Sequence, residues 1–142
     1  MKVYADSSVL VSAFTTETAS EAARQWLGGL SEDALLTSYW CRAEIVSALA
    51  VKSRRGAISQ SLAVMIAREI ASMLTHSATP IAINDAALLA AAELIERSPL
   101  PLRAPDALHL AIAQSGGAIV WTLDVDMAKA GAALDLGTRL LS

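Results

Sequence analysis

The sequence predicts an α/β protein in which a short, mostly parallel sheet of four or five strands is covered by helices on both faces. Short apolar runs typical of strands alternate with helical segments along the 142 residues, and this alternation is typical of parallel sheets. Hydrophobic residues make up 54% of the chain but aromatic residues only 4%, so small aliphatic side chains must fill the core. No linker-like stretch interrupts the sequence, and we therefore expect one domain spanning residues 1–142.

The first half of the chain opens with a buried strand and continues mainly as helices. Ala19, Ala22, Trp26 and Leu27 recur at helical spacing, which indicates a helix with one apolar face. Gly56, preceded by two arginines, closes a long helix, because basic residues and a following glycine favour a helix C-terminus. The predicted elements are a strand at residues 2–5, helices from residue 7 and at 18–30, a strand at 34–37, and helices at 39–54 and 59–74.

Prolines and glycines divide the second half of the chain. The prolines between residues 99 and 105 exclude a continuous helix there, whereas Pro105 suits the first turn of the next one. Gly116 and Gly117 end that helix. The predicted elements are a strand at residues 80–83, helices at 86–96 and 105–114, a strand at 118–122, a short helix at 127–133 and an edge strand within 135–141.

The bulk properties favour a cytoplasmic protein that does not cross a membrane. The single cysteine, Cys41, excludes an intramolecular disulfide and fits a reducing compartment; we expect it to be a core or surface thiol rather than a nucleophile. Asp6 interrupts the N-terminal apolar run, so no signal peptide is expected. Net charge is −3, which neither excludes a nucleic-acid substrate nor supplies the basic signature typical of one.

Acidic residues recur where predicted strands end and helices begin. Asp6 ends the first strand, Glu44 borders the apolar stripe of a long helix, and Asp106 opens a later helix. Asp124 follows the strand at 118–122, and Asp126 comes two residues further on. Burying a carboxylate at an apolar border is costly unless it is paired, and basic residues near these positions are few. Oxygen ligands without basic partners indicate a hard cation, Mg²⁺ or Mn²⁺.

Each of these residues also has a plain structural explanation. Asp6 and Asp106 can be explained as capping residues of the helices that follow them, with no further role. Asp124 and Asp126 can be turn residues, and Glu44 can face solvent or pair with a basic neighbour on its own helix. Together the residues are better explained by one site, because the strand ends and helix starts that carry them can meet at one edge of the sheet.

The chain resembles PIN-domain proteins, specifically VapC-type toxin ribonucleases, over nearly its whole length. Residues 4–10, Tyr-Ala-Asp-Ser-Ser-Val-Leu, resemble the family's acidic first strand, and Ala-Glu-Ile at 43–45 resembles its helix glutamate. Residues 105–111, Pro-Asp-Ala-Leu-His-Leu-Ala, carry the strongest internal signature, and Thr-Leu-Asp at 122–124 resembles the closing motif. The combination and its order are specific, whereas any single piece is weak.

The resemblance implies a three-layer α/β/α PIN-like sandwich and divalent-metal-dependent hydrolysis of RNA by a metal-activated water. It implies Mg²⁺ or Mn²⁺ as the cofactor. The catalytic residues and metal ligands that it implies are Asp6, Glu44, Asp106 and Asp124. Ser8 and Thr122 are expected to orient these carboxylates. Asp126 lies outside the strict pattern, and we expect it to be an accessory ligand or a supporting group.

Other residues and the partners follow from the same resemblance. His109 lies one helical turn after Asp106, and we expect a structural role rather than that of a general base. The role of Arg54 and Arg55, phosphate contact or helix cap, stays open. The expected partners are an RNA substrate, a small VapB-like antitoxin and a second copy of the chain, because the helices at 18–30 and 59–74 carry more apolar residues than one core face needs.

Three other classes of protein share some of these features. A haloacid-dehalogenase-type phosphatase needs a second aspartate two residues after Asp6, where Ser8 stands. A response-regulator receiver needs an acidic pair at the first strand end, and Asp6 has no acidic neighbour. The remaining alternative is a catalytically silent PIN-like module that binds RNA or protein. The complete set of four acidic residues argues against it, and an RNA cleavage assay separates the two.

Overall fold

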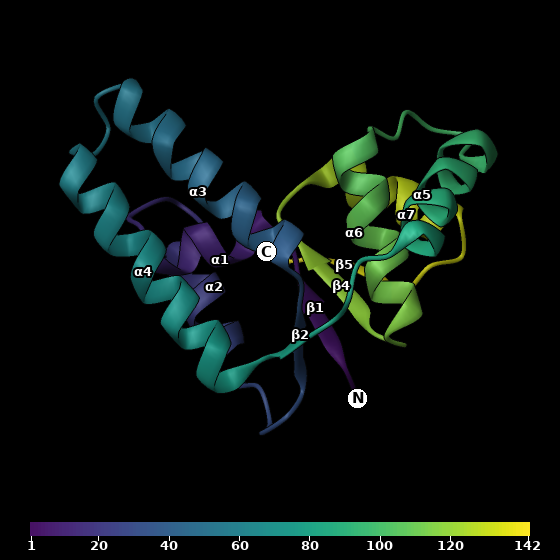
Figure 1. Ribbon diagram of the computed structural model, residues 1–142, viewed down its shortest axis with the longest axis horizontal. Helices are drawn as coiled ribbons and strands as arrows, with labels where there is room; N and C mark the ends of the chain where they lie inside the picture. The colour runs from purple at the N-terminus through teal and green to yellow at the C-terminus, as the bar shows by residue number, and fades with distance from the viewer.

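The fold is a parallel five-stranded sheet between two layers of helices (Figure 1). The structure, a computed structural model, describes residues 1–142. The strands are β1 (Val3–Ala5), β2 (Leu35–Thr37), β3 (Thr79–Pro80), β4 (Ile119–Thr122) and β5 (Thr138–Leu140). The helices are α1 (Ser7–Phe14), α2 (Ser20–Gly28), α3 (Tyr39–Arg54), α4 (Gln60–Ser77), α5 (Asp85–Arg97), α6 (Ala104–Ser115) and α7 (Val125–Ala133). The predicted fold class is confirmed, with every strand pair parallel.

The strand order β3-β2-β1-β4-β5 places a reversal of the chain beside β1. The chain adds β2 and β3 on one side of β1 and then returns to add β4 and β5 on the other. Val3 of β1 lies opposite Leu35 of β2 on one side and Ile119 of β4 on the other. In open α/β sheets, ligands bind outside the carboxyl ends of the strands at such a reversal. The carboxyl ends of β1 and β4 are therefore the expected position of a ligand site.

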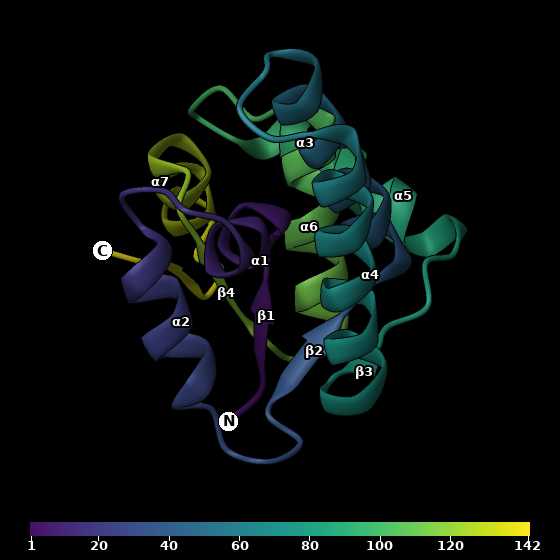
Figure 2. The ribbon, with the colours of Figure 1, turned by 90° about the vertical axis from the view of Figure 1, so that its left-hand side faces the viewer.

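Alternation of side chains along β1 gives the sheet two separate cores. Val3 and Ala5 pack with residues of α1–α4, whereas Tyr4 points to the opposite face and packs with residues of α5–α7. Figure 1 shows these two groups of helices on opposite sides of the sheet, and Figure 2 shows α1 between α2 and α4. Tyr4 thus brings the first strand into contact with the layer that carries α6.

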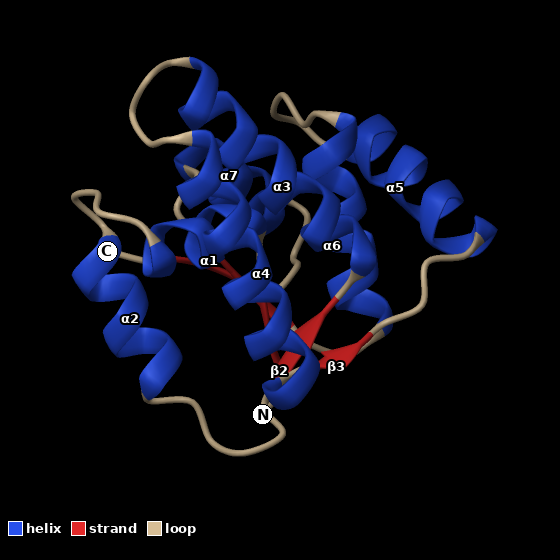
Figure 3. Cartoon of the chain, turned by 60° about the vertical axis from the view of Figure 1, so that its left-hand side comes forward, coloured by secondary structure: helices blue, strands red, loops and turns tan.

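The third strand is shorter than predicted. Residues 80–83 were expected to be extended, but β3 comprises only Thr79–Pro80. Its partner β2 ends at Thr37, after which the chain turns into α3, and only one further bond, from Ile81 N–H to Thr37 O, continues the pairing. Figure 3 shows how short the strands are beside the helices. The apolar residues at 80–83 therefore predicted a longer edge strand than the one that forms.

The helix expected at residues 18–30 is also shorter, and it exposes less apolar surface than predicted. α2 begins only at Ser20, whose hydroxyl accepts a hydrogen bond from Glu17 N–H in the preceding turn. Trp26 lies with its ring centroid 5.5 Å from that of Trp121 and is partly buried against the core. By contrast, α4 exposes Val64 and Met65. The apolar excess is therefore found on α4 and not on α2.

None of the helices combines the length and apolar character that crossing a membrane requires.

Candidate functional site

Acidic side chains from four separate segments meet outside the carboxyl ends of β1 and β4. Asp6 directly follows β1, Asp124 follows β4, Glu44 comes from α3, and Asp106 from the first turn of α6. The last three line a cavity of about 700 Å³ together with Asp126. Asp6 does not line this cavity, since it is only 5% exposed. The structure thus brings the predicted residues to one edge of the sheet, with Asp6 in a buried position.

Asp6 is held by three donors. Its Oδ1 accepts hydrogen bonds from the Ser8 hydroxyl at 2.5 Å and from Val9 N–H at 3.3 Å, and its Oδ2 accepts one from the Thr122 hydroxyl at 2.6 Å. Burial raises the pKa of the Asp6 carboxyl, and the Ser8 and Thr122 hydroxyls act in the opposite direction. These donors compensate part of the cost of burying a carboxylate. Asp6 also caps α1, so the capping explanation is confirmed, and it is compatible with a position at the candidate site.

The same two hydroxyls hold the loop after β4. Ser8 Oγ accepts a hydrogen bond from Leu123 N–H at 3.1 Å, and Thr122 Oγ1 accepts one from Asp124 N–H at 3.0 Å. Asp124 in turn caps α7, because its Oδ1 accepts from the backbone N–H groups of Asp126 and Met127. The Asp126 side chain is exposed at the edge of the cavity. The hydroxyl groups therefore fix the position of Asp124 relative to Asp6.

Glu44 is held through one of its two carboxylate oxygens. Oε1 accepts a hydrogen bond from the Ser7 hydroxyl at 3.1 Å and forms a second one with His109 Nε2. No protein donor reaches Oε2. Lys52, a basic residue on the same helix as Glu44, pairs with Glu17 instead. Glu44 is therefore neither a solvent-facing residue nor part of an ion pair on the helix surface.

The Asp106 carboxylate accepts no hydrogen bond from the protein. Of the four carboxylates, it is therefore the one most available to bind a ligand. Burial raises the pKa of its carboxyl, and the charges of Asp124, Glu44 and Asp6 raise it further, while His109 acts in the opposite direction. The carboxylates are thus close enough to repel one another. A bound cation would relieve this repulsion.

A buried polar group that the sequence did not reveal lies behind Glu44. Tyr4 Oη is 2.8 Å from His109 Nδ1 and 2.7 Å from Ser38 Oγ, and all three side chains are buried. Cys41 lies nearby, where burial raises the pKa of its thiol, so it is a core residue and not an activated nucleophile. Tyr4, Ser38 and Ser7 were missed because they are far from their partners in the sequence.

The donor set fits Mg²⁺ or Mn²⁺ in its chemistry. All the candidate ligands are carboxylate oxygens, and Asp6, Asp106 and Asp124 form no ion pair with a lysine or arginine. No group of three or more histidine, cysteine, aspartate or glutamate side chains is arranged so that it could hold a metal ion as it stands. Occupation would therefore require the half-buried and exposed carboxylates to adjust around the buried Asp6.

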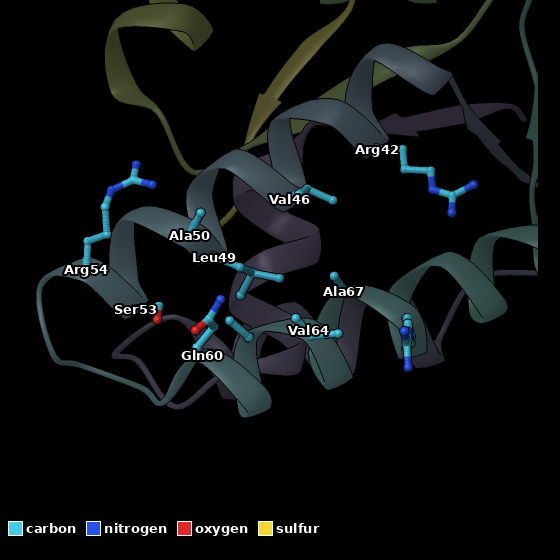
Figure 4. A pocket seen from close by; sticks show the side chains of 11 residues that line it. Arg42, Val46, Leu49, Ala50, Ser53, Arg54, Gln60, Val64 and Ala67 are labelled. Atoms are coloured by element: carbon cyan, nitrogen blue, oxygen red, sulfur yellow. The ribbon is translucent and has the colours of Figure 1, made fainter.

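A second hollow lies between α3 and α4, away from the carboxylates (Figure 4). This α3–α4 groove has a volume of about 540 Å³. Its floor is apolar and includes Val46, Leu49 and Val64. Arg42 and Arg54 also line it, and Figure 4 shows them at opposite ends of α3. Arg54 therefore belongs to this groove and not to the carboxylate cavity.

The sequence identifies the family. Residues 3–133 match the PIN domain family, so the chain belongs to that family. The comparison with curated proteins gives no match.

Solved structures with the same fold include bacterial toxin proteins. FitAcB from Neisseria gonorrhoeae is 16% identical, with a TM-score of 0.71 over 96% of this chain and 95% of that one. VapC20 from Mycobacterium tuberculosis, a toxin that cleaves the sarcin–ricin loop, is 16% identical, with a TM-score of 0.66 over 92% and 95%. A toxin–antitoxin complex from Klebsiella pneumoniae is 18% identical, with a TM-score of 0.67 over 97% and 96%. At these identities the likeness concerns the fold.

Proposed function

We propose that the protein is a divalent-metal-dependent endoribonuclease and the toxin of a type II toxin–antitoxin pair. The observation that carries this proposal is the meeting of Asp6, Glu44, Asp106 and Asp124 at the chain reversal beside β1 in a PIN domain. The description of VapC20 as a toxin that cleaves the sarcin–ricin loop supports RNA as the substrate class.

The four carboxylates would hold the cation, directly or through water. When bound, Mg²⁺ or Mn²⁺ supplies activation of water and neutralisation of charge at the phosphate. Asp6, fixed by Ser8 and Thr122, would be the least mobile ligand, and Asp126 would assist from the edge of the cavity. Arg103 and Lys129 line the same cavity and would attract the RNA backbone.

The test is RNA cleavage by the wild type and by Asp6→Asn, with Mg²⁺, with Mn²⁺ and with EDTA. Outer partners of metal ligands typically contribute about 10–100-fold to activity, so losing a ligand should cost more than about 100-fold. Asp85→Asn, the same change at an exposed position on α5, serves as the matched control and should cleave like the wild type. The products should carry 5′-phosphate and 3′-hydroxyl ends.

The substrates should include total RNA and a sarcin–ricin loop oligonucleotide, since one specific target can be missed with a single arbitrary RNA. Cleavage that persists in EDTA, or 2′,3′-cyclic phosphate ends, would show that the carboxylates are not the catalytic centre. A folded wild type that binds Mn²⁺ to no measurable extent and cleaves none of these RNAs would favour the silent binding module.

We also propose that a small VapB-like antitoxin binds in the α3–α4 groove. One structure with the same fold is described as a toxin–antitoxin complex. The groove joins an apolar floor to Arg42, Arg54 and Arg68, none of which forms an ion pair within the chain. This combination fits an antitoxin segment with apolar side chains on one face and acidic residues beside them.

The antitoxin proposal is tested by co-purification with the small protein encoded by the neighbouring reading frame. Val64→Asp should abolish the complex, because it places a charge on the apolar floor. Leu140→Asp, at an exposed apolar position on β5, should leave it intact. Equal recovery of the complex with both variants would contradict the assignment of the groove.

A homodimer is the third part of the proposal. Met65 on α4 is more than half exposed, and so are Leu88 and Leu89 on α5 in the opposite helix layer; exposed apolar side chains commonly mark interfaces. Light scattering at micromolar concentration should return twice the mass of the chain, which is 14.8 kDa. A clean monomer would remove the dimer and leave the nuclease proposal unaffected.

A further inference from the structure

A row of buried polar groups runs from the start of α3 through β1 and α6 to Glu44. Cys41 N–H donates to Ser38 Oγ at 3.2 Å, and Ser38 Oγ lies 2.7 Å from Tyr4 Oη. Tyr4 Oη lies 2.8 Å from His109 Nδ1, and His109 Nε2 is hydrogen-bonded to Glu44 Oε1. Tyr4 and His109 are at most 1% exposed, so water does not compete for these bonds.

We propose that Ser38, Tyr4 and His109 form a one-directional hydrogen-bond chain that positions the Glu44 carboxylate. Oε1 is held against His109, and Oε2 is left free to act as a ligand. The three residues are positioning residues and not catalytic residues, and their assignment rests on the proposed role of Glu44 in holding a divalent cation. It replaces the general structural role that the sequence gave to His109.

The direction of the chain follows from the hydrogens available. Ser38 Oγ already accepts from Cys41 N–H, and its only other hydrogen-bond partner is Tyr4 Oη, to which it donates its own hydrogen. Tyr4 therefore donates its hydrogen to His109 Nδ1. A tyrosine phenol retains this hydrogen at neutral pH, because its ordinary pKa is about 10. With Nδ1 as an acceptor, the imidazole carries its hydrogen on Nε2 and donates it to Glu44 Oε1.

The opposite direction would leave two groups unsatisfied. His109 Nδ1–H would donate to Tyr4, Tyr4 would donate to Ser38, and the Ser38 hydrogen would have no acceptor. In a neutral imidazole the Nε2 lone pair would then face the Glu44 carboxylate, which is repulsive. Since unsatisfied buried polar groups are costly, the chain runs toward Glu44.

A glutamate side chain on a helix surface has three rotatable bonds, so its carboxylate can take many positions. The hydrogen-bond chain matters because it restricts them. The Ser7 hydroxyl and His109 both donate to Oε1, and these two donors select one rotamer. Oε2 has no protein donor, and Glu44 lines the carboxylate cavity. Groups that orient a metal ligand in this way typically contribute about 10–100-fold to metal affinity.

The tautomer of His109 is the first test, and it needs no metal. His76 is the only other histidine, so a His76→Gln chain labelled with ¹⁵N leaves His109 as the single imidazole. Its NMR spectrum at pH 7.5 should show hydrogen on Nε2 and none on Nδ1. Tyr4→Phe removes one oxygen atom and should shift the imidazole toward a mixture of tautomers. Hydrogen on Nδ1 in the chain that retains Tyr4 would overturn the proposal.

Mn²⁺ affinity, measured by calorimetry, is the second test and separates positioning from general stability. His109→Leu fills similar space but has no donor, and it should weaken Mn²⁺ binding by about 10–100-fold. His109→Gln retains an N–H near the position of Nε2 and should bind Mn²⁺ close to wild type. The melting temperature of each variant is measured alongside, because a merely structural role would make affinity follow stability.

The outcomes distinguish this inference from the proposed function. A wild type that binds Mn²⁺ while His109→Leu binds it equally well would overturn the positioning role alone. A wild type that binds no Mn²⁺ would overturn both. Loss of Mn²⁺ affinity in His109→Leu with recovery in His109→Gln would support the proposed hydrogen-bond chain. His76→Gln should behave like the wild type in both tests.

Discussion

Asp6 and Asp106 are two carboxylates of the same candidate site, but they differ in burial and in the hydrogen bonds that they accept. Asp6 is buried and accepts hydrogen bonds from Ser8, Val9 and Thr122. Asp106 is half-buried in the first turn of α6 and accepts none, while the charges of its neighbours raise its pKa. One carboxylate is thus positioned by protein donors, and the other is positioned by none.

This difference separates the parts of the site that belong to folding from those that belong to binding. Removing a donor from Asp6 should damage the folded state, because a buried acceptor loses its partner. Removing the charge of Asp106 should instead relieve repulsion in the absence of a cation.

Thr122→Val should have the largest effect. Valine has nearly the same shape, but it leaves Asp6 Oδ2 without its donor and Asp124 N–H without its acceptor. An unsatisfied buried group costs about 1–3 kcal/mol, which corresponds to about 4–10 °C in melting temperature for a chain of this length. RNA cleavage should fall by about 10–100-fold.

Thr75→Val, an exposed threonine on α4, is the matched control for that change. Calorimetry and the cleavage assay should find it close to wild type. If the two variants lost equal stability, the special role assigned to the Thr122 hydroxyl would be wrong.

Asp106→Asn should have the opposite sign without metal. The raised pKa of Asp106 means that the wild type loses stability as the pH rises from the usual value of 3.8 through the raised one. The variant should therefore melt at a higher temperature at pH 7, and its advantage should disappear below about pH 4. Melting curves at several pH values in EDTA measure this directly.

Added Mn²⁺ should reverse the ranking of wild type and Asp106→Asn. At about 100 times its dissociation constant a ligand adds about 2.7 kcal/mol, or about 5–10 °C for a protein of this size. The wild type should gain this and Asp106→Asn much less. A wild-type melting curve that saturating Mn²⁺ leaves unchanged would count against the metal site.

Glu17→Gln should have the smallest effect. Lys52 lowers the pKa of Glu17, so this carboxylate stabilises the fold above its usual value of 4.5 and the contribution is lost as the pH falls through the lowered value. Both side chains are about one-third exposed, and such pairs contribute about 0–1 kcal/mol. The variant should melt at a slightly lower temperature than the wild type at pH 7 and match it in acid. The sign of the change at pH 7 is therefore opposite to that of Asp106→Asn.

The sequence predicted those parts of the structure that depend on local pattern. The strand at 2–5 and the helix at 39–54 were found in place, because apolar periodicity and end signals specify them. The extent of β3 was wrong, since an edge strand lasts only as long as its partner β2. The pattern of one segment contains no information about where its neighbour ends.

Contacts between distant residues were beyond the reach of pattern alone. Glu44 and His109 are 65 positions apart, and Tyr4 and His109 are 105 apart. Motifs brought the acidic residues to one edge of the sheet, but they did not show which group holds which. For Asp6 the two explanations offered by the sequence were not exclusive, because the residue that caps α1 is also the buried carboxylate of the site.

The two outer strands also determine how the sheet can meet another chain. β3 has two residues, and its Pro80 has no N–H to offer, while β5 has three residues and carries the exposed Arg139. Short borders with proline and charge resist the addition of a foreign strand. Extension of the sheet from one molecule into the next is therefore disfavoured, and stable association must use helical surfaces. The same property protects the protein from edge-to-edge aggregation when it is present at high concentration.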